Sequence, residues 1–402
     1  MRLLLFLTLL LLSPVSQALE NWRFSGFGSL GLTKINRDDL SFGAADNNWD
    51  FDNDTSLGLQ LQGNLTNTVS FTTQVSTNGP ELDGREAYKP ELQWLFLTHE
   101  ATPNLQWRLG RMQSSHYLFS STIDVGYAYP WARPPVDAYS YLLGPLKNLD
   151  GADLLYTHDL TPELELDIQL LAGYAEGELL DVEVKAEPSY GTTLTLRATD
   201  WQLRYSFHLD KTSIQSDDLD TAVELYSNLG QTVDPIFGEI GEFFISTDSD
   251  YQYHALGAQW EGYPWGLIAE KYLVRPPREE GFANRSEGWY VSALYHYGAF
   301  TPYVSYGAYK NVTNKELIPL LNQALENPNF SAFAPLLQLN KQLIEQFEAR
   351  EQSLTLGLRY DFHTQACLKA EVQYFNFQGG TTGQAYPEGD SRPGSATMFT
   401  VV

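Results

Sequence analysis

The sequence predicts an all-β fold: a transmembrane, up-and-down antiparallel β-barrel of about sixteen strands. Segments in which apolar and polar residues alternate, as the side chains of a strand do, recur along the whole chain. Seven tight connections of two to five residues alternate with eight much longer ones. Bacterial outer-membrane barrels carry short turns at one end and long loops at the other, whereas a soluble sandwich has no reason to segregate them.

The first element is an export signal over residues 1–18. The chain starts Met-Arg, continues with an apolar run over 3–12, and then offers the small residue Ala18 for cleavage. This run is too short to span a bilayer easily, so we expect a single barrel domain over 19–402. No later apolar run reaches the ~18 residues that a membrane helix needs.

The chain is strongly acidic, with 25 Lys and Arg against 50 Asp and Glu and a formal net charge of −25. Nucleic acid is therefore excluded as a partner, because its binding depends on basic patches. The charge does permit attraction of cations to surface loops or to a pore. The single cysteine, Cys367, rules out an intrachain disulfide.

The clearest strand is the segment ELELDIQLLA, in which every second residue from Leu164 to Ala172 is apolar and those between are polar. The strands predicted in this way are 21–34, 55–63, 68–76, 91–100, 104–112, 151–159, 163–174, 191–198, 201–209, 251–261, 265–274, 287–297, 301–310, 353–362, 365–377 and 396–402. An even number is usual for single-chain bacterial barrels. Sixteen strands enclose an aqueous lumen, whereas eight are filled by side chains, so the strand number indicates transport.

The two ends of the barrel follow from its connections. Most short connections carry the Gly, Pro, Asn or Asp of tight hairpins. Because the first strand follows the signal peptide from the periplasm, the long loops lie outside the cell. These loops are 35–54, 77–90, 113–150, 175–190, 210–250, 275–286, 311–352 and 378–395. Loops 210–250 and 311–352 are expected to be partly helical, the latter from leucines at helical spacing, and such helices either cap the pore or pack on its rim.

Aromatic residues near the strand ends predict two girdles at the level of the lipid headgroups. The girdle candidates are Trp94, Trp107, Trp201, Trp260, Trp265 and Trp289, with Tyr205, Tyr251, Tyr295, Tyr297 and Tyr303. Loop 113–150 is also rich in aromatic and apolar residues, which is unusual for a solvated loop. Such a loop buries its apolar surface most simply by folding into the lumen.

At this point the chain resembles the Gram-negative general-porin superfamily. The FSGFGSLGL run of the first strand, the segment DVGYAYPWARPPVDAY followed by LDGADLLY, and the strand plan carry the resemblance, which covers nearly the whole chain in outline. In such porins the third loop folds inward and presents acidic residues opposite a row of basic residues on the wall. A transverse field of this kind orients polar solutes and sets ion preference.

The resemblance implies a set of constriction residues. On loop 113–150 they are Asp124, Asp137, Arg133, Tyr127, Tyr129 and Trp131, with Asp150 and Asp153 as weaker acidic candidates. On the wall, strand parity selects Arg108, Arg197, Arg204, Arg359 and Lys369, and a bulge at Gly110 would add Arg111. These groups either face solute across the passage or pair with one another and hold the loop down. One departure concerns the last strand, which ends at Val402 where family members carry an aromatic residue. Either the sequence is clipped there or the sixteenth strand is misassigned.

Other chemistry is weakly indicated. Asp50, Asp52 and Asp54 alternate as calcium ligands do, but the glycine and glutamate of a calcium loop are missing. A divalent ion bridging this loop to lipopolysaccharide is one reading, and a solvated acidic loop is the other. Ser114 and Ser115 next to His116 do not make a catalytic triad by adjacency. We expect no metal, no cofactor and no enzyme activity.

The sequence therefore predicts an outer-membrane channel for passive diffusion of small hydrophilic solutes and ions, with a mild cation preference. One alternative is a substrate-selective channel, for example for oligosaccharides, with Tyr127, Tyr129 and Trp131 as a stacking track. The other is a non-conducting adhesin or structural barrel. The expected partners are the lipid bilayer, lipopolysaccharide and small solutes. The resemblance implies a homotrimer, with loop 77–90 as a subunit latch.

Overall fold

The computed structural model describes residues 21–79, 87–139, 146–179, 182–276, 285–312, 316–387 and 394–402. The predicted signal peptide lies outside these residues, as does the middle of loop 77–90. Within the described part of the chain, none of the helices has the length and apolar composition that crossing a membrane requires.

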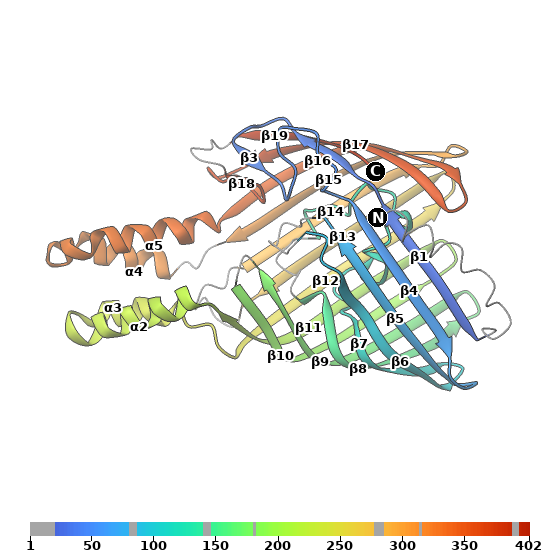
Figure 1. Cartoon of the computed structure of the whole chain (residues 1–402), viewed down its shortest axis with the longest axis horizontal. Helices are drawn as coiled ribbons and strands as arrows, with labels where there is room; N and C mark the ends of the chain where they lie inside the picture. The colour runs from blue at the N-terminus through green and yellow to red at the C-terminus, as the bar shows by residue number, and fades with distance from the viewer. Residues whose placement is uncertain are drawn as a thin grey trace, which may run out of the picture.

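Among the described residues, sixteen antiparallel strands form the barrel, and their arrangement can be followed in Figure 1. The first strand is interrupted at Leu30 and Gly31 and consists of β1 (Trp22–Ser29) and β2 (Leu32–Ile35). The others are β4 (Ser56–Asn64), β5 (Val69–Asn78), β6 (Glu91–Thr102), β7 (Leu105–Gln113), β8 (Asn148–Thr161), β9 (Leu164–Leu179), β10 (Val182–Arg197), β11 (Trp201–Gln215), β12 (Ser249–Gly262), β13 (Trp265–Arg275), β14 (Arg285–Tyr295), β15 (Phe300–Val312), β16 (Ala349–His363), β17 (Ala366–Phe377) and β19 (Ser395–Val401). Two further short strands, β3 (Leu40–Ser41) and β18 (Tyr386–Pro387), pair with each other outside the barrel sheet.

The two halves of the first strand close the ring of strands. From β4 onward each strand pairs with its successor as far as β17 and β19. At the ends of this series, β1 pairs with β4 and β2 pairs with β19. A closed barrel leaves no long open edge in lipid, where an unpaired backbone group costs several kcal/mol.

The predicted fold class is confirmed, and each of the sixteen predicted strands overlaps an observed one. The last strand pairs with both β17 and β2, so the sixteenth strand is not misassigned. The predicted long loop 175–190 is wrong, because β9 and β10 continue through it as a hairpin. Ala175, Val184 and Ala186 of this hairpin are buried together with Leu146, which explains why the strands continue.

The outer face of the barrel is an apolar band. Large apolar side chains on alternate positions point outward and are exposed, for example Leu256, Leu267 and Leu356 at 53%, 45% and 57%. Trp201 and Trp260 lie on this face near the periplasmic turns, as predicted for a girdle. Trp94 and Tyr303 do not belong to a girdle: Trp94 lines a cavity in the lumen, and the buried Tyr303 hydroxyl donates to Glu371.

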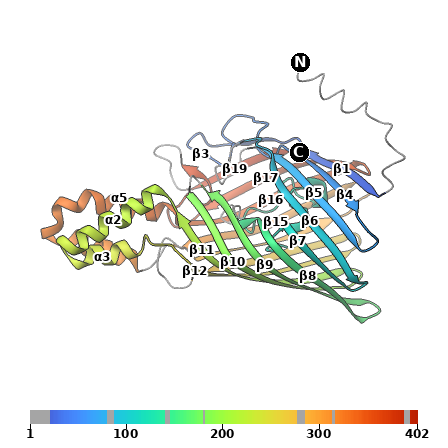
Figure 2. The ribbon, with the colours of Figure 1, turned by 60° about the horizontal axis from the view of Figure 1, so that its bottom comes forward.

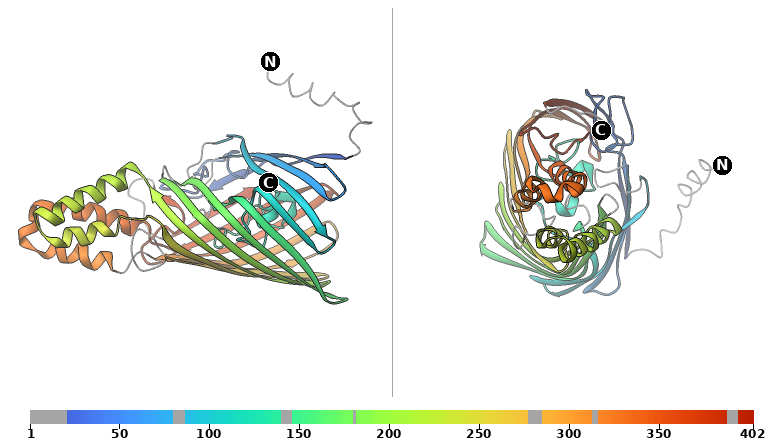
Figure 3. Two further views of the ribbon diagram at one scale, coloured as in Figure 1. Left: turned by 90° about the horizontal axis from the view of Figure 1, so that it is seen from below. Right: turned by 90° about the vertical axis from the view of Figure 1, so that its left-hand side faces the viewer.

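Two extracellular loops fold together as a helical bundle. The loop after β11 forms α2 (Asp217–Thr232) and α3 (Pro235–Glu242), and the loop after β15 forms α4 (Leu317–Glu326), η4 (Pro328–Phe333) and α5 (Ala334–Gln346). Ser216 caps α2 by accepting a hydrogen bond from the Leu219 amide. Both loops supply the core of the bundle, with Phe237 and Leu321 fully buried. The bundle projects beyond the extracellular end of the barrel, and in the view along the barrel it lies in front of the mouth (Figure 3).

Candidate functional site

The third long loop lies inside the barrel, as predicted. The described residues of this loop, 114–139 and 146–147, are here called L3; they follow β7 and contain the short helices η1 (Ser120–Thr122) and η2 (Gly126–Ala128). Its first residues cross the lumen to β10 and β11. There the Arg204 guanidinium donates to the Ser115 carbonyl at 3.0 Å, and the Ser115 and Thr193 hydroxyls are 2.9 Å apart. Figure 2 shows the barrel from the side of β8 to β12.

The middle of L3 packs on the inner wall made by β12 to β16. Its apolar residues and the tyrosines of that wall form one buried cluster, which includes Tyr117, Leu118, Tyr129, Trp131, Ala138, Tyr253, Tyr272, Tyr290, Tyr303 and Tyr309. The rings of Trp131 and Tyr290 meet edge to face at 5.4 Å, a favourable aromatic geometry. The loop therefore covers the inner wall on this side of the lumen.

Trp131 anchors the loop most deeply. Its side chain is 1% exposed, and its indole nitrogen donates to the hydroxyls of Ser292 at 3.1 Å and Ser305 at 3.0 Å. Tyr129 is also buried, at 6% exposed, whereas Tyr127 is 38% exposed. A stacking track for sugars would need all three aromatic faces to be open, and in this arrangement only that of Tyr127 is partly open.

Two of the predicted wall bases bind the backbone of L3. The Arg359 guanidinium donates to the carbonyls of Tyr127 at 2.9 Å and Tyr129 at 3.0 Å, and it lies 4.6 Å from the Tyr127 ring centre. The Lys369 ammonium donates to the carbonyls of Gly126 and Trp131. Buried carbonyl groups need such partners, since leaving them unpaired is costly. Arg359 and Lys369 therefore hold the loop in place and do not stand opposite acidic residues across the passage.

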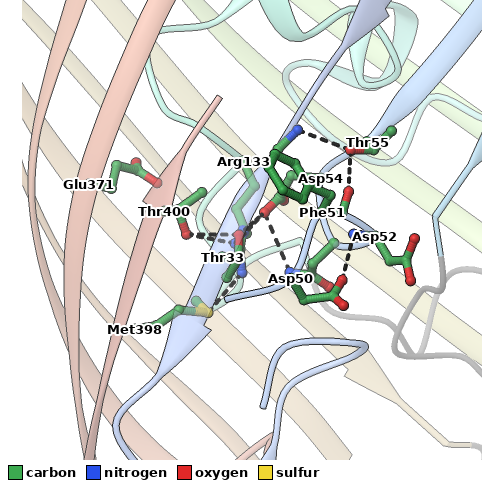
Figure 4. Close-up of polar contacts among 12 residues, drawn as sticks. Thr33, Asp50, Phe51, Asp52, Asp54, Thr55, Arg133, Glu371, Met398 and Thr400 are labelled. Carbon is green, nitrogen blue, oxygen red and sulfur yellow. Dashed lines mark hydrogen bonds and ion pairs between the residues drawn. The ribbon is translucent and has the colours of Figure 1, made fainter. Parts of the chain in front are cut away.

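Arg133 connects L3 to the first strand, the first loop and the last strand (Figure 4). Its guanidinium donates to the Asp54 carboxylate and to the Thr400 hydroxyl, the latter at 2.9 Å. The Arg133 and Asp54 side chains are 13% and 11% exposed, so solvent screens this ion pair little. Asp54 has a φ of 65°, a left-handed conformation that aspartate tolerates better than most residues.

The carboxylates of the acidic segment around Asp54 do not converge on one point. The Asp50 carboxylate accepts from the Asp52 amide at 2.5 Å, and the Asp52 carboxylate accepts from the Tyr88 hydroxyl at 2.7 Å. Each of the three aspartates thus has a separate protein partner. Across the described residues, no group of three or more His, Cys, Asp or Glu side chains is arranged to hold a metal ion.

The two acidic candidates of L3 are both withdrawn from the open lumen. Asp137 is 1% exposed, and its carboxyl accepts from the Ser353 hydroxyl at 2.5 Å. Burial raises the pKa of Asp137 to about 7. The wall accommodates it through glycines, since a Cβ on Gly288 would lie 1.8 Å from the Asp137 carbonyl oxygen. The Asp124 carboxylate accepts from the Lys147 ammonium at 2.6 Å within the loop itself.

The open part of the lumen lies on the other side of L3. A cavity of about 360 Å³ separates the start of the loop from the inner wall formed by β6 to β11. Its lining includes Arg108, Arg197 and Arg204, the hydroxyl residues Ser114, Ser115, Ser120, Ser121, Thr157, Thr193 and Thr195, the amides of Gln106, Gln113 and Gln169, and Asp167. Three of the predicted wall bases therefore meet at one passage, and the loop faces them with hydroxyl groups.

Most of the positive charge in this passage is neutralised locally. Arg108 donates to the Asp153 carboxylate, with one contact at 2.9 Å. Arg197 pairs with Glu165 at 2.8 Å and with Asp167 at 2.9 Å. Arg204 is the exception, since no carboxylate of the described residues lies within ion-pair distance of it; it donates instead to the Ser115 carbonyl and the Ser206 hydroxyl.

Arg111 lies outside this passage. The register of β7 runs without a shift through Gly110, so the bulge that would have turned Arg111 inward is absent at that position. Arg111 therefore points to the opposite face of β7 from Arg108 and pairs with Asp150 at 2.9 Å.

The sequence analysis does not identify several groups that anchor L3, among them Ser292, Ser305, Ser353 and Asp54. A signal for them was present in the strand pattern. Four successive strands, β12 to β15, place tyrosines on the face that points into the lumen, where a water-filled wall needs polar side chains. Inward aromatic residues on consecutive strands indicate a covering element, and L3 is apolar enough to supply it.

Comparison with known proteins identifies the fold. Neither a protein-family model nor a curated protein matches the chain. Among solved structures, OprB of Pseudomonas putida matches with a TM-score of 0.55 and 9% identity, covering 95% of this chain and 93% of that one. The anion-selective porin of Comamonas acidovorans matches with a TM-score of 0.53 and 11% identity over 94% of this chain and 98% of that one. The outer-membrane channel DcaP of Acinetobacter baumannii matches with a TM-score of 0.51 and 12% identity, covering 96% of this chain and 99% of that one. The chain thus has the multi-pass β-barrel fold of outer-membrane porins.

Proposed function

We propose that the chain is an outer-membrane porin, a water-filled channel for passive diffusion of small hydrophilic solutes and ions. The observation that supports this best is the polar cavity between L3 and the wall of β6 to β11. Its hydroxyl, amide and guanidinium groups can replace the water contacts of a polar solute. The apolar outer band and the porin fold support a location in the outer membrane.

Ion preference follows from the distribution of charge along the channel. In the passage the arginines are nearly balanced by carboxylates, and among the described residues Arg204 is the one base of the lining that has no ion pair. The outer end is acidic: Asp217, Asp218 and Asp220 occupy the first turn of α2, and Glu176 and Glu178 lie on the β9–β10 hairpin. Because the acidic outer end concentrates cations before they reach a nearly neutral passage, we propose a mild cation preference.

Reconstitution of the folded protein in planar lipid bilayers tests the channel. We expect stepwise, ohmic conductance increments, with conductance reduced by polyols small enough to enter the passage and unaffected by larger ones. Folded protein that inserts without conductance would refute the proposal and favour the adhesin or structural barrel. Current block by one class of sugar alone would instead favour the substrate-selective channel.

The remaining parts of the proposal concern partners. We propose lipid and lipopolysaccharide contacts on the apolar band, and a homotrimer as the assembled form. The subunit latch suggested for loop 77–90 falls largely outside the described residues. Cross-linking of the folded protein in detergent, followed by electrophoresis without heating, tests the trimer.

A further inference from the structure

A tryptophan lines the open passage, on the wall that faces the start of L3. Trp94 and Phe96 share the inner face of β6, while Leu95 between them is 43% exposed on the outer face. Opposite Trp94 in the register is Gln74, which also points inward and is 1% exposed. The inward tyrosines of β12 to β15 are buried under L3, whereas Trp94 lines the cavity and keeps part of its surface open.

The indole is held in position by its neighbours. The rings of Trp94 and Phe96 are 6.3 Å apart and tilted by 48°, and the Arg108 guanidinium lies 5.2 Å from the Phe96 ring centre. The Trp94 indole nitrogen donates to the side-chain oxygen of Gln113 at 3.4 Å. Phe96 is only 9% exposed. Of the two rings, Trp94 is therefore the one that a solute in the passage can reach.

The cavity surrounds this indole with uncharged hydrogen-bonding groups. Its lining includes the hydroxyls of Ser120, Ser121 and Thr195 and the amides of Gln106 and Gln169. Hydroxyl and amide side chains both donate and accept hydrogen bonds, so they can pair with either the hydrogen or the oxygen of a solute hydroxyl group.

The charged groups of the lining are engaged with the protein itself. Arg108 and Arg197 are paired with carboxylates. Arg204 donates to the Ser115 carbonyl at 3.0 Å and to the Ser206 hydroxyl at 3.3 Å. The hydroxyl and amide groups are therefore the ones available to a solute, together with the apolar face of the indole.

We propose that Trp94 and the hydroxyl and amide groups around it bind neutral, polyhydroxylated six-membered rings, such as a single pyranose or cyclitol. The C–H face of such a ring packs on the indole, and its equatorial hydroxyls point sideways to the hydrogen-bonding groups. The cavity volume of about 360 Å³ lies near the lower end of small-molecule pockets, roughly 300 to 1,000 Å³, which suits one ring. This inference rests on the proposed function, because the ring reaches the site through the channel. The affinity is low enough for the solute to leave again.

The test is saturation-transfer difference NMR on the full-length folded protein, in a zwitterionic detergent without a sugar headgroup. The probes are myo-inositol and sorbitol, which have equal numbers of carbon atoms and hydroxyl groups and differ in ring closure. We expect a saturable signal from myo-inositol and a half-saturating concentration about tenfold higher or more for sorbitol. Equal binding of the two probes would overturn the proposal, since hydrogen bonding alone would then explain it.

Variants at position 94 test the role of the aromatic face. Trp94→Leu keeps an apolar side chain and removes the flat ring, so the half-saturating concentration of myo-inositol should rise about tenfold or more. Trp94→Phe keeps an aromatic face and should keep most of the affinity. The matched control is Trp107→Leu, which removes a tryptophan that is 41% exposed on the outer face of β7 and should bind like the parent. Equal affinities of the Trp94→Leu and Trp107→Leu variants would overturn the proposal.

A second variant leaves the tryptophan in place. Ser121→Ala combined with Thr195→Val removes two hydroxyls of the lining and should also weaken myo-inositol binding, whereas unchanged binding would overturn the role of these groups. Conductance in planar bilayers is measured on the same preparations. Protein that conducts and does not bind the ring refutes this inference alone. Protein that binds the ring without conducting supports the site and refutes the channel, so the two failures are distinguishable.

Discussion

Arg133 of L3 and Asp54 of the first extracellular loop form an ion pair that is largely buried, although they are 79 positions apart in the chain. The same guanidinium also reaches Thr33 on β2 and Thr400 on β19, the two strands that close the barrel. L3 is thereby attached to the closing strands as well as to the wall of β12 to β16. The passage is bounded by a loop that is fixed at both sides of the lumen.

The first prediction concerns this ion pair. Asp54→Asn leaves the buried Arg133 charge without its carboxylate, which costs about 3 kcal/mol when one partner of a buried pair is removed. Asparagine tolerates the left-handed backbone at position 54, so the effect is one of charge. We expect larger and noisier single-channel currents as this end of L3 loosens. Asp50→Asn, which changes a neighbouring carboxylate without an arginine partner, is the control and should conduct like the parent protein.

The second prediction concerns Trp131. Trp131→Ala removes the tyrosine contacts and both serine hydrogen bonds, and a buried aromatic truncated to alanine typically costs 3–5 kcal/mol. Trp131→Phe keeps most of the packing and loses the hydrogen bonds, so its effect on the urea midpoint should be smaller. Single-channel conductance should rise most in the alanine variant. Equal conductance in the alanine variant and the parent would show that Trp131 does not hold L3 over the lumen.

The third prediction is a pH dependence set by Asp137. Its pKa of about 7 in the folded protein exceeds the ordinary value of 3.8, so the folded state keeps a proton that the unfolded chain has lost. Its contribution to stability is therefore largest in acid and declines as the pH rises from about 4 to 7. Urea unfolding of the parent and of Asp137→Asn at pH 5 and pH 8 measures this. The asparagine variant should lose less stability between the two pH values than the parent does.

The fourth prediction concerns Arg204. Arg204→Gln removes the uncompensated base of the passage while keeping a donor for the Ser115 carbonyl. Zero-current potentials in a salt gradient should then shift toward stronger cation preference. Arg108→Gln, which leaves the buried Asp153 carboxylate unpaired, should shift the potential in the same direction and also lower stability. An unchanged potential in the Arg204 variant would place the ion pathway elsewhere.

The strand pattern predicted the barrel well because alternation between lipid and lumen is a property of each strand by itself. Arg108, Arg197 and Arg204 were selected by that parity, and they do line the passage. The partners of Asp137 and Arg133 were beyond such reasoning. These partners depend on which part of the barrel wall L3 packs against. The tyrosines that determine this packing lie on strands more than a hundred residues away in the chain.

The same limit explains the difference between the expected and observed roles of the loop residues. The resemblance to porins places Asp137 in the passage, but Gly288 leaves room for the Asp137 carbonyl and Gly307 for its carboxyl group, so that the residue packs against the wall and is buried there. The sequence predicts a loop over 175–190, where the structure has the hairpin of β9 and β10. Continuous cross-strand pairing decided its structure.

The helical bundle imposes an order on assembly. Its core joins side chains of α2 and α3 to side chains of α4 and α5, for example through the hydrogen bond from Asn340 to the Tyr226 hydroxyl at 2.6 Å. Neither helical pair can complete its apolar core alone, and the strands β12 to β15 separate them in the chain. The bundle can therefore form only after those strands have come together, and an epitope tag inserted in either loop would leave the helices of the other loop without their packing partner.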